Sequence, residues 1–179
     1  FKYVIEMIEV QLVNPNDEPI GSMEKLEAHQ KGLLHRAISV LIFNSKGEML
    51  LQRRALKKYH SPGLWTNTCC SHPYPFEIPQ DAASRRLNEE MNIESKLNFA
   101  FKFIYKTEFS NGLIENELDH VFIGYSDETP HLNTDEAVAF RWVTIKDLQR
   151  DIEKNPENYT VWFKIIIEEH LKQVETHLS

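Results

Sequence analysis

The distribution of apolar and polar positions along the chain predicts a mixture of strands and helices. Residues 37–43 form an apolar run rich in β-branched side chains, which is typical of a buried strand. Residues 44–47 have the composition of a turn, so residues 48–53 are expected to return as the second strand of a hairpin. Aromatic side chains recur at every second position over 101–109, which predicts a strand with one aromatic face.

The same periodicities predict the remaining elements. Further strands are expected at residues 4–13, 113–125 and 139–144. Helices are expected at residues 80–91, 145–154 and 161–175, together with a short helix at 23–28 capped by Ser22. Residues 55–79 are rich in proline and are expected to form a long irregular loop, which in a compact domain is usually functional. Together these elements predict an α+β domain in which helices flank a sheet.

Composition narrows the class of protein. The length of 179 residues suits a single domain, expected to span 1–179. The net charge of −7 argues against nucleic acid as a partner. No apolar run approaches the roughly 18 residues of a membrane span, and acidic residues within 1–14 argue against a signal peptide. We therefore expect a monomer that acts on a small molecule, without a membrane partner.

The only two cysteines are adjacent, at Cys69 and Cys70, and His72 follows closely. Consecutive Cα atoms are about 3.8 Å apart, which is shorter than the roughly 4.4 Å minimum of an ordinary disulfide. Two free thiols are therefore expected, and they indicate a reducing, cytoplasmic compartment. A thiol so close to an imidazole also predicts an activated cysteine beside a metal centre.

Basic residues gather at 53–58, where the sequence reads Arg-Arg-Ala-Leu-Lys-Lys. In a protein of negative net charge, such a segment would supply the local cations that a small anionic substrate needs. A solvated loop after a strand is an equally good interpretation of this segment alone.

Carboxylates recur along the predicted strand at 113–125. Glu115, Glu117 and Asp119 are spaced two apart, so their side chains point to the same face of the strand. Neighbouring carboxylates repel one another and usually have a metal, a shared proton or open solvent. An exposed face of an edge strand is one interpretation, but the apolar residues 121–123 favour a buried strand.

Histidines can complete a metal site with these carboxylates. His29 and His35 converge if the chain turns between them, at Gly32, and His72 is the third candidate. Three imidazoles and the two glutamates of the strand would form a five-ligand set suited to Zn²⁺, Mn²⁺ or Mg²⁺. The other histidines are expected to be structural or exposed; they are His60, His120, His131, His170 and His177.

A longer pattern covers residues 71–93 and reads Ser71-x5-Glu77-x7-Arg85-Arg86-Leu87-x-Glu89-Glu90-x-Asn92-Ile93. It resembles the Nudix box, G-x5-E-x7-R-E-U-x-E-E-x-G-U, in which U is an aliphatic residue. Ser71 and Asn92 replace glycines, and Arg86 replaces a glutamate of the metal-binding acidic cluster of Nudix hydrolases. A cation at this position argues against ordinary Nudix hydrolysis and is compatible with phosphate binding.

In combination and in order, the motifs of residues 17–148 resemble those of the type I isopentenyl-diphosphate isomerases, a family with the Nudix fold. The resemblance rests on residues 21–25, His29, His35, 53–55, 62–67, 70–73, 85–86 and 115–117. It implies a Nudix-like mixed β-sheet core flanked by helices. It also implies an isomerase of isoprenoid biosynthesis that interconverts isopentenyl and dimethylallyl diphosphate through a tertiary carbocation.

The resemblance also implies chemical roles. Cys70 would be the base, and Glu117, close to Tyr105, would be the acid; Glu117, Tyr105 and a metal-bound water remain alternatives as the immediate proton donor. Trp162 would stabilise the carbocation by a cation–π interaction, or it is a core residue. Cys69 receives no role.

The implied binding residues form three groups. A divalent ion would be held by His29, His35, His72, Glu115 and Glu117. A Mg²⁺ ion would accompany the substrate diphosphate, with Glu90 and the backbone carbonyl of Cys70 as ligands. The charge of the diphosphate would be balanced by Lys25, Arg53, Lys57 and Arg86.

Two other functions remain open from the sequence. The acidic remnant of the box, Glu77, Glu89 and Glu90, is also expected of a Nudix-type diphosphate hydrolase. A non-catalytic Nudix-like module would bind its ligand without turnover, but it would leave the cysteine, the histidines and the paired glutamates unexplained.

Overall fold

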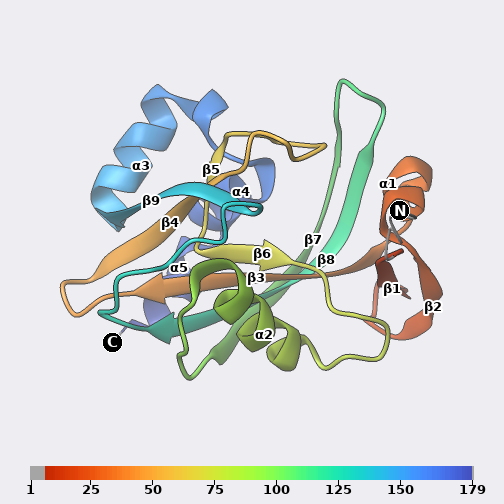
Figure 1. Cartoon of the computed structure of the whole chain (residues 1–179), viewed down its shortest axis with the longest axis horizontal. Helices are drawn as coiled ribbons and strands as arrows, with labels where there is room; N and C mark the ends of the chain where they lie inside the picture. The colour runs from red at the N-terminus through yellow and green to blue at the C-terminus, as the bar shows by residue number, and fades with distance from the viewer. Residues whose placement is uncertain (1–6, 179) are drawn as a thin grey trace, which may run out of the picture.

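The computed structural model of the protein describes residues 7–178 (Figure 1). A mixed sheet lies at its centre, and the middle strand is β3 (His35–Phe43). β3 runs antiparallel to β1 (Glu9–Val13), β4 (Glu48–Arg54) and β6 (Cys69–Ser71), and parallel to β8 (Ile114–Tyr125). Almost every residue of β3 is buried, so the predicted buried strand and its hairpin with β4 are confirmed.

The other strands extend this sheet. β2 (Pro19–Glu24) pairs with β1, β7 (Asn98–Glu108) pairs with β8, and both β5 (Trp65–Thr66) and β9 (Ala137–Thr144) pair with β4. The helices are α1 (Lys25–Lys31), α2 (Pro79–Met91), α3 (Ile145–Lys154), α4 (Val161–Glu169) and α5 (Leu171–Thr176), with a 3-10 helix at Pro156–Asn158. This is the α+β architecture that the sequence predicted.

Alternation along β3 divides the core into two layers. Ile38, Val40 and Ile42 pack with the apolar face of α2, drawn in green in Figure 1. Leu41 and Phe43 belong to the other layer, which contains side chains from α3, α4 and α5, drawn in blue. Neighbouring residues on one strand therefore face different layers, and this decides which of the two cysteines can reach a site on the α4 side of the sheet.

The predicted short helix at 23–28 was wrong in its start and in its cap. Ser22 and Met23 lie in β2, where they pair with Gln11 and Val10 of β1. The helix begins at Lys25 instead, and the carboxylate of Glu24 caps it by accepting hydrogen bonds from the backbone N–H groups of residues 26 and 27 at 3.0 and 2.9 Å. The backbone groups of these two residues form hydrogen bonds with β1 instead of the helical hydrogen bonds that the local pattern predicted.

Several other segments differ from the prediction. The expected loop at 55–79 contains β5 and β6, which are too short to show a periodic pattern. The expected helix at 161–175 is interrupted at His170, which separates α4 from α5. The strand expected at 4–13 begins at Glu9, and residues 4–6 lie outside the described part of the chain. No helix within residues 7–178 is both long and apolar enough to cross a membrane.

Candidate active site and metal centre

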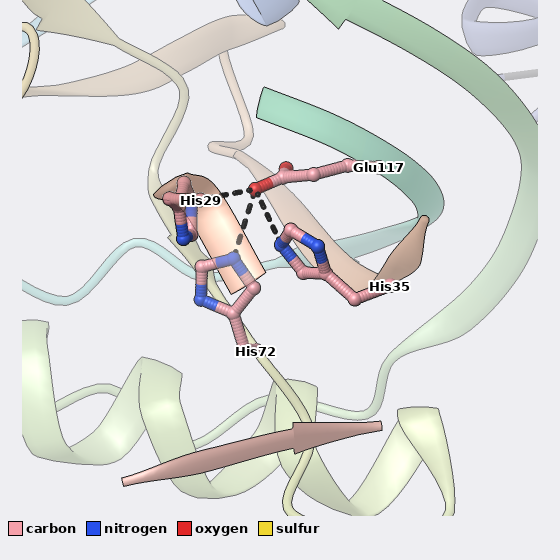
Figure 2. Close-up of side chains that lie close together, drawn as sticks. All are labelled: His29, His35, His72 and Glu117. Atoms are coloured by element: carbon pink, nitrogen blue, oxygen red, sulfur yellow. Dashed lines mark hydrogen bonds and ion pairs between the residues drawn. The ribbon is translucent and has the colours of Figure 1, made fainter. Parts of the chain in front are cut away.

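Three histidines converge on one oxygen of Glu117 (Figure 2). The Nε2 atoms of His72, His35 and His29 lie 2.9, 3.3 and 3.7 Å from Glu117 Oε1. His29 and His35 are fully buried, and Glu117 is 5% exposed. The structure thus brings together four of the five predicted metal ligands.

Local structure explains why these four side chains meet. His29 lies in the last turn of α1, and Gly32 ends the helix with a φ of 65°, so the chain turns where the sequence predicted. His35 then begins β3 directly opposite Glu117 in the parallel ladder with β8, and His72 follows β6 on the other edge of β3. A Cβ atom at position 32 would lie 3.1 Å from the side chain of Ile114, so this turn also requires the small size of glycine.

The donor set of this cluster is suited to a divalent cation. The Nδ1 atoms of His29 and His35 lie 2.7 and 2.8 Å from the carbonyl oxygens of Lys25 and Leu33, so each Nδ1–H is donated and each Nε2 carries the free lone pair. These two Nε2 atoms are buried and have no hydrogen-bond partner within residues 7–178. Burial lowers the pKa of His72 to about 3, which keeps its imidazole neutral. Neutral imidazoles oriented by carbonyl oxygens and combined with a carboxylate are typical metal ligands.

Tyr105 links the two glutamates of β8. Its hydroxyl oxygen lies 2.7 Å from Glu117 Oε2 and 2.9 Å from Glu115 Oε2. The two oxygens of Glu117 therefore have different neighbours, because Oε1 faces the histidines and Oε2 faces Tyr105. Burial, followed by the charge of Glu117, raises the pKa of Glu115 well above its ordinary value. A nearby cation would relieve this repulsion.

Glu115, predicted as a fifth metal ligand, lies beside the four-residue cluster rather than within it. Its carboxylate groups with His29 and His60, and Glu115 Oε1 is 3.2 Å from His60 Nε2. His60, which was expected to be structural or exposed, is buried with 7% exposure and lines the same pocket as the glutamate. A single histidine in an irregular loop carries no local signal of such a position, so sequence reasoning missed it.

The two cysteines face opposite layers of the molecule, and both are free thiols. Cys69 is fully buried in the layer that contains α2. Cys70 pairs with Ser39 of β3 and lines the pocket described below. Its Sγ atom is 3.7 Å from Nη1 of Arg54. Burial raises the pKa of Cys70 to about 12, although the charge of Arg54 opposes this shift, so the thiol is protonated at neutral pH.

A pocket of about 330 Å³ joins these groups, which is the size of a site for a small molecule. Cys70, Tyr105, Glu117 and Trp162 line it. The lysines and arginines that line it are Lys25, Arg54, Lys57, Lys58, Arg85 and Arg86. Burial, and then the charges of Lys58 and Arg54, lower the pKa of Lys25, as expected where cations are crowded.

Arg53 is the predicted substrate-binding residue that the structure places elsewhere. Its side chain is exposed, its Nε donates a hydrogen bond to the carbonyl of Gly63 at 2.9 Å, and it does not line the pocket. The neighbouring Arg54 is 8% exposed and points inward instead. The alternation of side chains along β4 decides between the two arginines, and the basic segment alone could not show which one faced inward.

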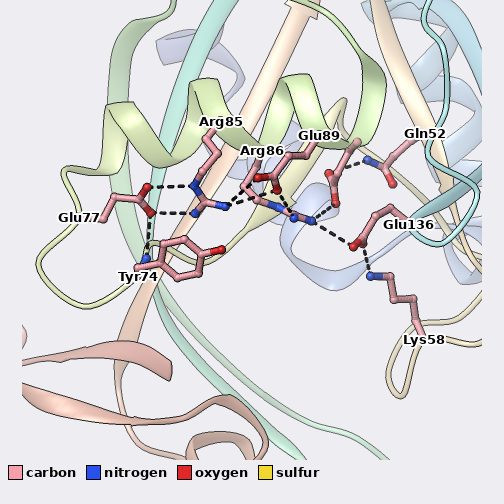
Figure 3. Close-up of polar contacts among 9 residues, drawn as sticks. Gln52, Lys58, Tyr74, Glu77, Arg85, Arg86, Glu89 and Glu136 are labelled. Atoms are coloured by element: carbon pink, nitrogen blue, oxygen red, sulfur yellow. Dashed lines mark hydrogen bonds and ion pairs between the residues drawn. The ribbon is translucent and has the colours of Figure 1, made fainter. Parts of the chain in front are cut away.

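The arginine that departs from the Nudix box lies in a carboxylate network (Figure 3). Arg86 contacts Glu89 at 2.6 Å, Glu90 at 3.1 Å and Glu136 at 3.2 Å. Glu136 also pairs with Lys58. Glu90 is buried, and its Oε2 accepts a hydrogen bond from Gln52 at 3.3 Å. Arginine and lysine side chains therefore form ion pairs with the carboxylates that would bind metal ions in a Nudix hydrolase.

Asp119 is a further buried carboxyl group of β8, and its protonation in the native state can be tested. It is 1% exposed, its Oδ2 accepts a hydrogen bond from Ser39 at 2.7 Å, and its Oδ1 has no partner among the described residues. Burial raises the pKa of Asp119 well above its ordinary value, so the native protein keeps a proton that the unfolded chain releases as the pH rises.

Asp119→Asn should therefore gain stability relative to the native sequence as the pH increases from 5 to 8. Below the pKa that Asp119 has in the unfolded chain, this proton contributes fully to the stability of the wild-type protein. The contribution decreases as the pH rises toward the pKa of Asp119 in the folded protein, by up to about 1.4 kcal/mol per pH unit. Urea unfolding of both proteins at several pH values measures the difference. A difference that is independent of pH would show that Asp119 is ionised in the native state.

Comparisons with known proteins define the class first. Residues 33–163 match the family model of the NUDIX domain. Solved structures agree in fold: the DR0079 protein of Deinococcus radiodurans superimposes with a TM-score of 0.68 at 20% identity, covering 82% of this chain and 89% of that one. A MutT Nudix hydrolase from Burkholderia pseudomallei superimposes with a TM-score of 0.61, also at 20% identity, and covers 76% of this chain and 97% of that one. The protein has a Nudix domain.

Closer relatives specify the family. The isopentenyl-diphosphate Delta-isomerase 2 of Aromatoleum aromaticum is 53% identical over 154 residues, which cover 86% of this chain and 82% of that protein. The isopentenyl-diphosphate Delta-isomerase of Pectobacterium atrosepticum is 50% identical over 159 residues, and these cover 89% of each chain. The chain belongs to the isopentenyl-diphosphate Delta-isomerase family, as the sequence motifs predicted.

Proposed function

We propose that this protein interconverts isopentenyl diphosphate and dimethylallyl diphosphate in isoprenoid biosynthesis, with Cys70 and Glu117 as the two proton-transferring residues. The observation that supports this most directly is that a thiol and a tyrosine-linked glutamate line one pocket of about 330 Å³ beside a group of cations. The reaction needs these parts. It adds a proton to the terminal alkene carbon and removes another from the methylene group on the far side of the central carbon.

Glu117 can serve as both ligand and acid because its two oxygens have separate neighbours. Oε1 faces the three histidines, whereas Oε2 is 2.7 Å from the hydroxyl of Tyr105. A proton on Oε2, shared with Tyr105, is compatible with ligation through Oε1. A divalent ion, whether Zn²⁺, Mn²⁺ or Mg²⁺, would supply positive charge that makes this proton more acidic. We assign His29, His35, His72 and Glu117 to this ion, with Glu115 approaching from beside them.

Cys70 acts at the other end of the alkene in this proposal. Its thiol lies beside Arg54, whose positive charge lowers the pKa of Cys70 and so partly offsets the larger rise that burial causes. Trp162 lines the same pocket and is 3% exposed, and its Nε1 donates to Asn67 at 3.2 Å, so the indole ring is held in place. The face of a fixed indole can stabilise a carbocation by on the order of 1–2 kcal/mol.

The diphosphate is proposed to bind at the crowded cations. Lys25, Arg54, Lys58 and Arg86 line the pocket, and Arg54 forms no ion pair within residues 7–178. Lys57 also lines the pocket, but it is exposed and pairs with Asp135. We assign Mg²⁺ bound with the diphosphate to Glu90 and the carbonyl oxygen of Cys70, where the ion would share the Glu90 carboxylate with Arg86.

The assay that tests this function uses the purified protein with isopentenyl diphosphate and Mg²⁺. We expect dimethylallyl diphosphate to form without release of phosphate, and the reaction to stop when a chelator removes the divalent ions. Phosphate release without the isomer would instead identify a Nudix-type hydrolase, and binding without turnover would identify a non-catalytic module. Metal analysis of the same preparation identifies the ion at the histidine cluster.

We also propose that residues 1–179 act as a single domain, as a monomer, in the cytoplasm, without nucleic-acid or membrane partners. The two free thiols support a reducing compartment, and the net charge of −7 disfavours nucleic acid. Light scattering of the purified protein measures its oligomeric state.

A further inference from the structure

His60 is a buried histidine at the candidate metal centre that the proposed reaction does not use. It lies between β4 and β5, in a segment that contributes no metal ligand. Its ring is nearly parallel to those of Phe109 and His29, with centroid distances of 5.3 and 5.7 Å and interplanar angles of 17° and 22°. Its centroid lies 6.0 Å from that of the Trp162 ring, in a T-shaped arrangement with an interplanar angle of 80°. The ring is thus held in one orientation by several neighbours.

The polar atoms of His60 point to a single partner. Its Nε2 lies 3.2 Å from Glu115 Oε1, and its Nδ1 is buried without a partner within the described residues. A neutral imidazole carries one N–H donor and one acceptor. A proton on Nδ1 would bury an unsatisfied donor and would turn the Nε2 lone pair toward a carboxylate oxygen. The proton therefore belongs on Nε2, where Glu115 accepts it.

We propose that His60 is an outer residue of the metal centre, which donates a hydrogen bond from Nε2 to Glu115 Oε1 and so holds Glu115 in position to complete the ligand set. Tyr105 holds the other oxygen of Glu115 at 2.9 Å, so the carboxylate is fixed from both sides. Residues that position a ligating carboxylate typically change metal affinity by about 10- to 100-fold when they are removed.

A direct bond between His60 and the ion is less compatible with the geometry. His29 Nε2 has one lone pair, which can serve one ion, and it belongs both to the four-residue cluster and to the group with His60 and Glu115. His60 is not part of the four-residue cluster. If an ion binds among His29, His35, His72 and Glu117, His60 therefore contacts Glu115 and does not contact the ion itself.

The test compares metal affinities of the full chain. His60→Phe keeps the aromatic ring and removes the N–H, whereas His60→Gln keeps a donor. We expect the Zn²⁺ affinity, measured by competition with a chromogenic chelator, to fall by about 10- to 100-fold in His60→Phe and to recover in part in His60→Gln. His170→Phe is the matched control, since His170 is a histidine outside the site that packs against Phe101 and Phe103.

The outcomes separate this proposal from its alternatives. Unchanged Zn²⁺ affinity in His60→Phe would overturn it, and His60→Leu provides a second apolar variant if the first does not fold. The absorption spectrum of the Co²⁺-substituted protein should show the same number of metal ligands in His60→Phe as in the wild-type protein. Loss of a ligand would show that His60 binds the ion directly and would overturn the proposal that it acts through Glu115. The inference rests on the metal centre proposed above but not on the reaction, so metal affinity remains decisive even if the isomerase assay fails.

Discussion

Cys70→Ala lowers kcat for the isomerisation of isopentenyl diphosphate by at least roughly 10²–10⁴-fold, the range typical of acid–base residues. The alanine side chain cannot accept the proton that leaves the substrate. The diphosphate-binding cations are unaffected, so KM should change little. Steady-state kinetics with isopentenyl diphosphate measures both constants.

Cys69→Ala is the matched control, because it removes the same chemical group one residue away. Cys69 is fully buried in the core layer that contains α2 and does not line the pocket. We expect kcat to stay near the wild-type value, with a modest loss of stability from the small cavity. The reverse pattern, in which activity depends on Cys69 and not on Cys70, would show that the assignment of the base is wrong.

Glu117→Gln should lower kcat by roughly 10⁴-fold, the upper end of the range for an acid–base residue, because it removes both the acid and a metal ligand. The amide has nearly the same shape, and its oxygen can still accept a hydrogen bond from Tyr105. We therefore expect the far-ultraviolet circular dichroism spectrum to be unchanged while bound metal decreases. Kinetics, metal analysis and the spectrum are measured on the same preparation.

Glu108→Gln tests whether loss of any nearby negative charge has the same effect. Glu108 ends β7 and is exposed. Its replacement should leave kcat and metal content unchanged. Near-normal turnover in Glu117→Gln itself would rule out Glu117 as the acid, whatever the result for the control.

The sequence predicted the central parts of the site because their periodicity is local. Glu115 and Glu117 are two apart on a long strand, so a shared face followed from strand geometry alone. Gly32 identified the turn that brings His29 to His35. These features depend on a few neighbouring residues, and the structure contains them as predicted.

The features that sequence reasoning missed depend on partners far away in the chain. Ser22 was expected to cap a helix but pairs with β1, and no local pattern could reveal that pairing. Arg54 rather than Arg53 faces the pocket, because the orientation of β4 in the sheet decides it. His60 meets Glu115 only because the β4–β5 segment reaches the start of β8, so a pattern search treats it as one histidine among several.

The parallel pairing of β3 with β8 also has a consequence for the order of folding. It places His35 opposite Glu117, although many residues separate them in sequence, and His29 and His72 come from two further segments. Contacts of such long sequence separation form late, because closing the intervening chain costs entropy. We therefore expect the sheet to assemble before the metal-binding set, unlike in a zinc finger, and the ion to stabilise the folded protein by mass action.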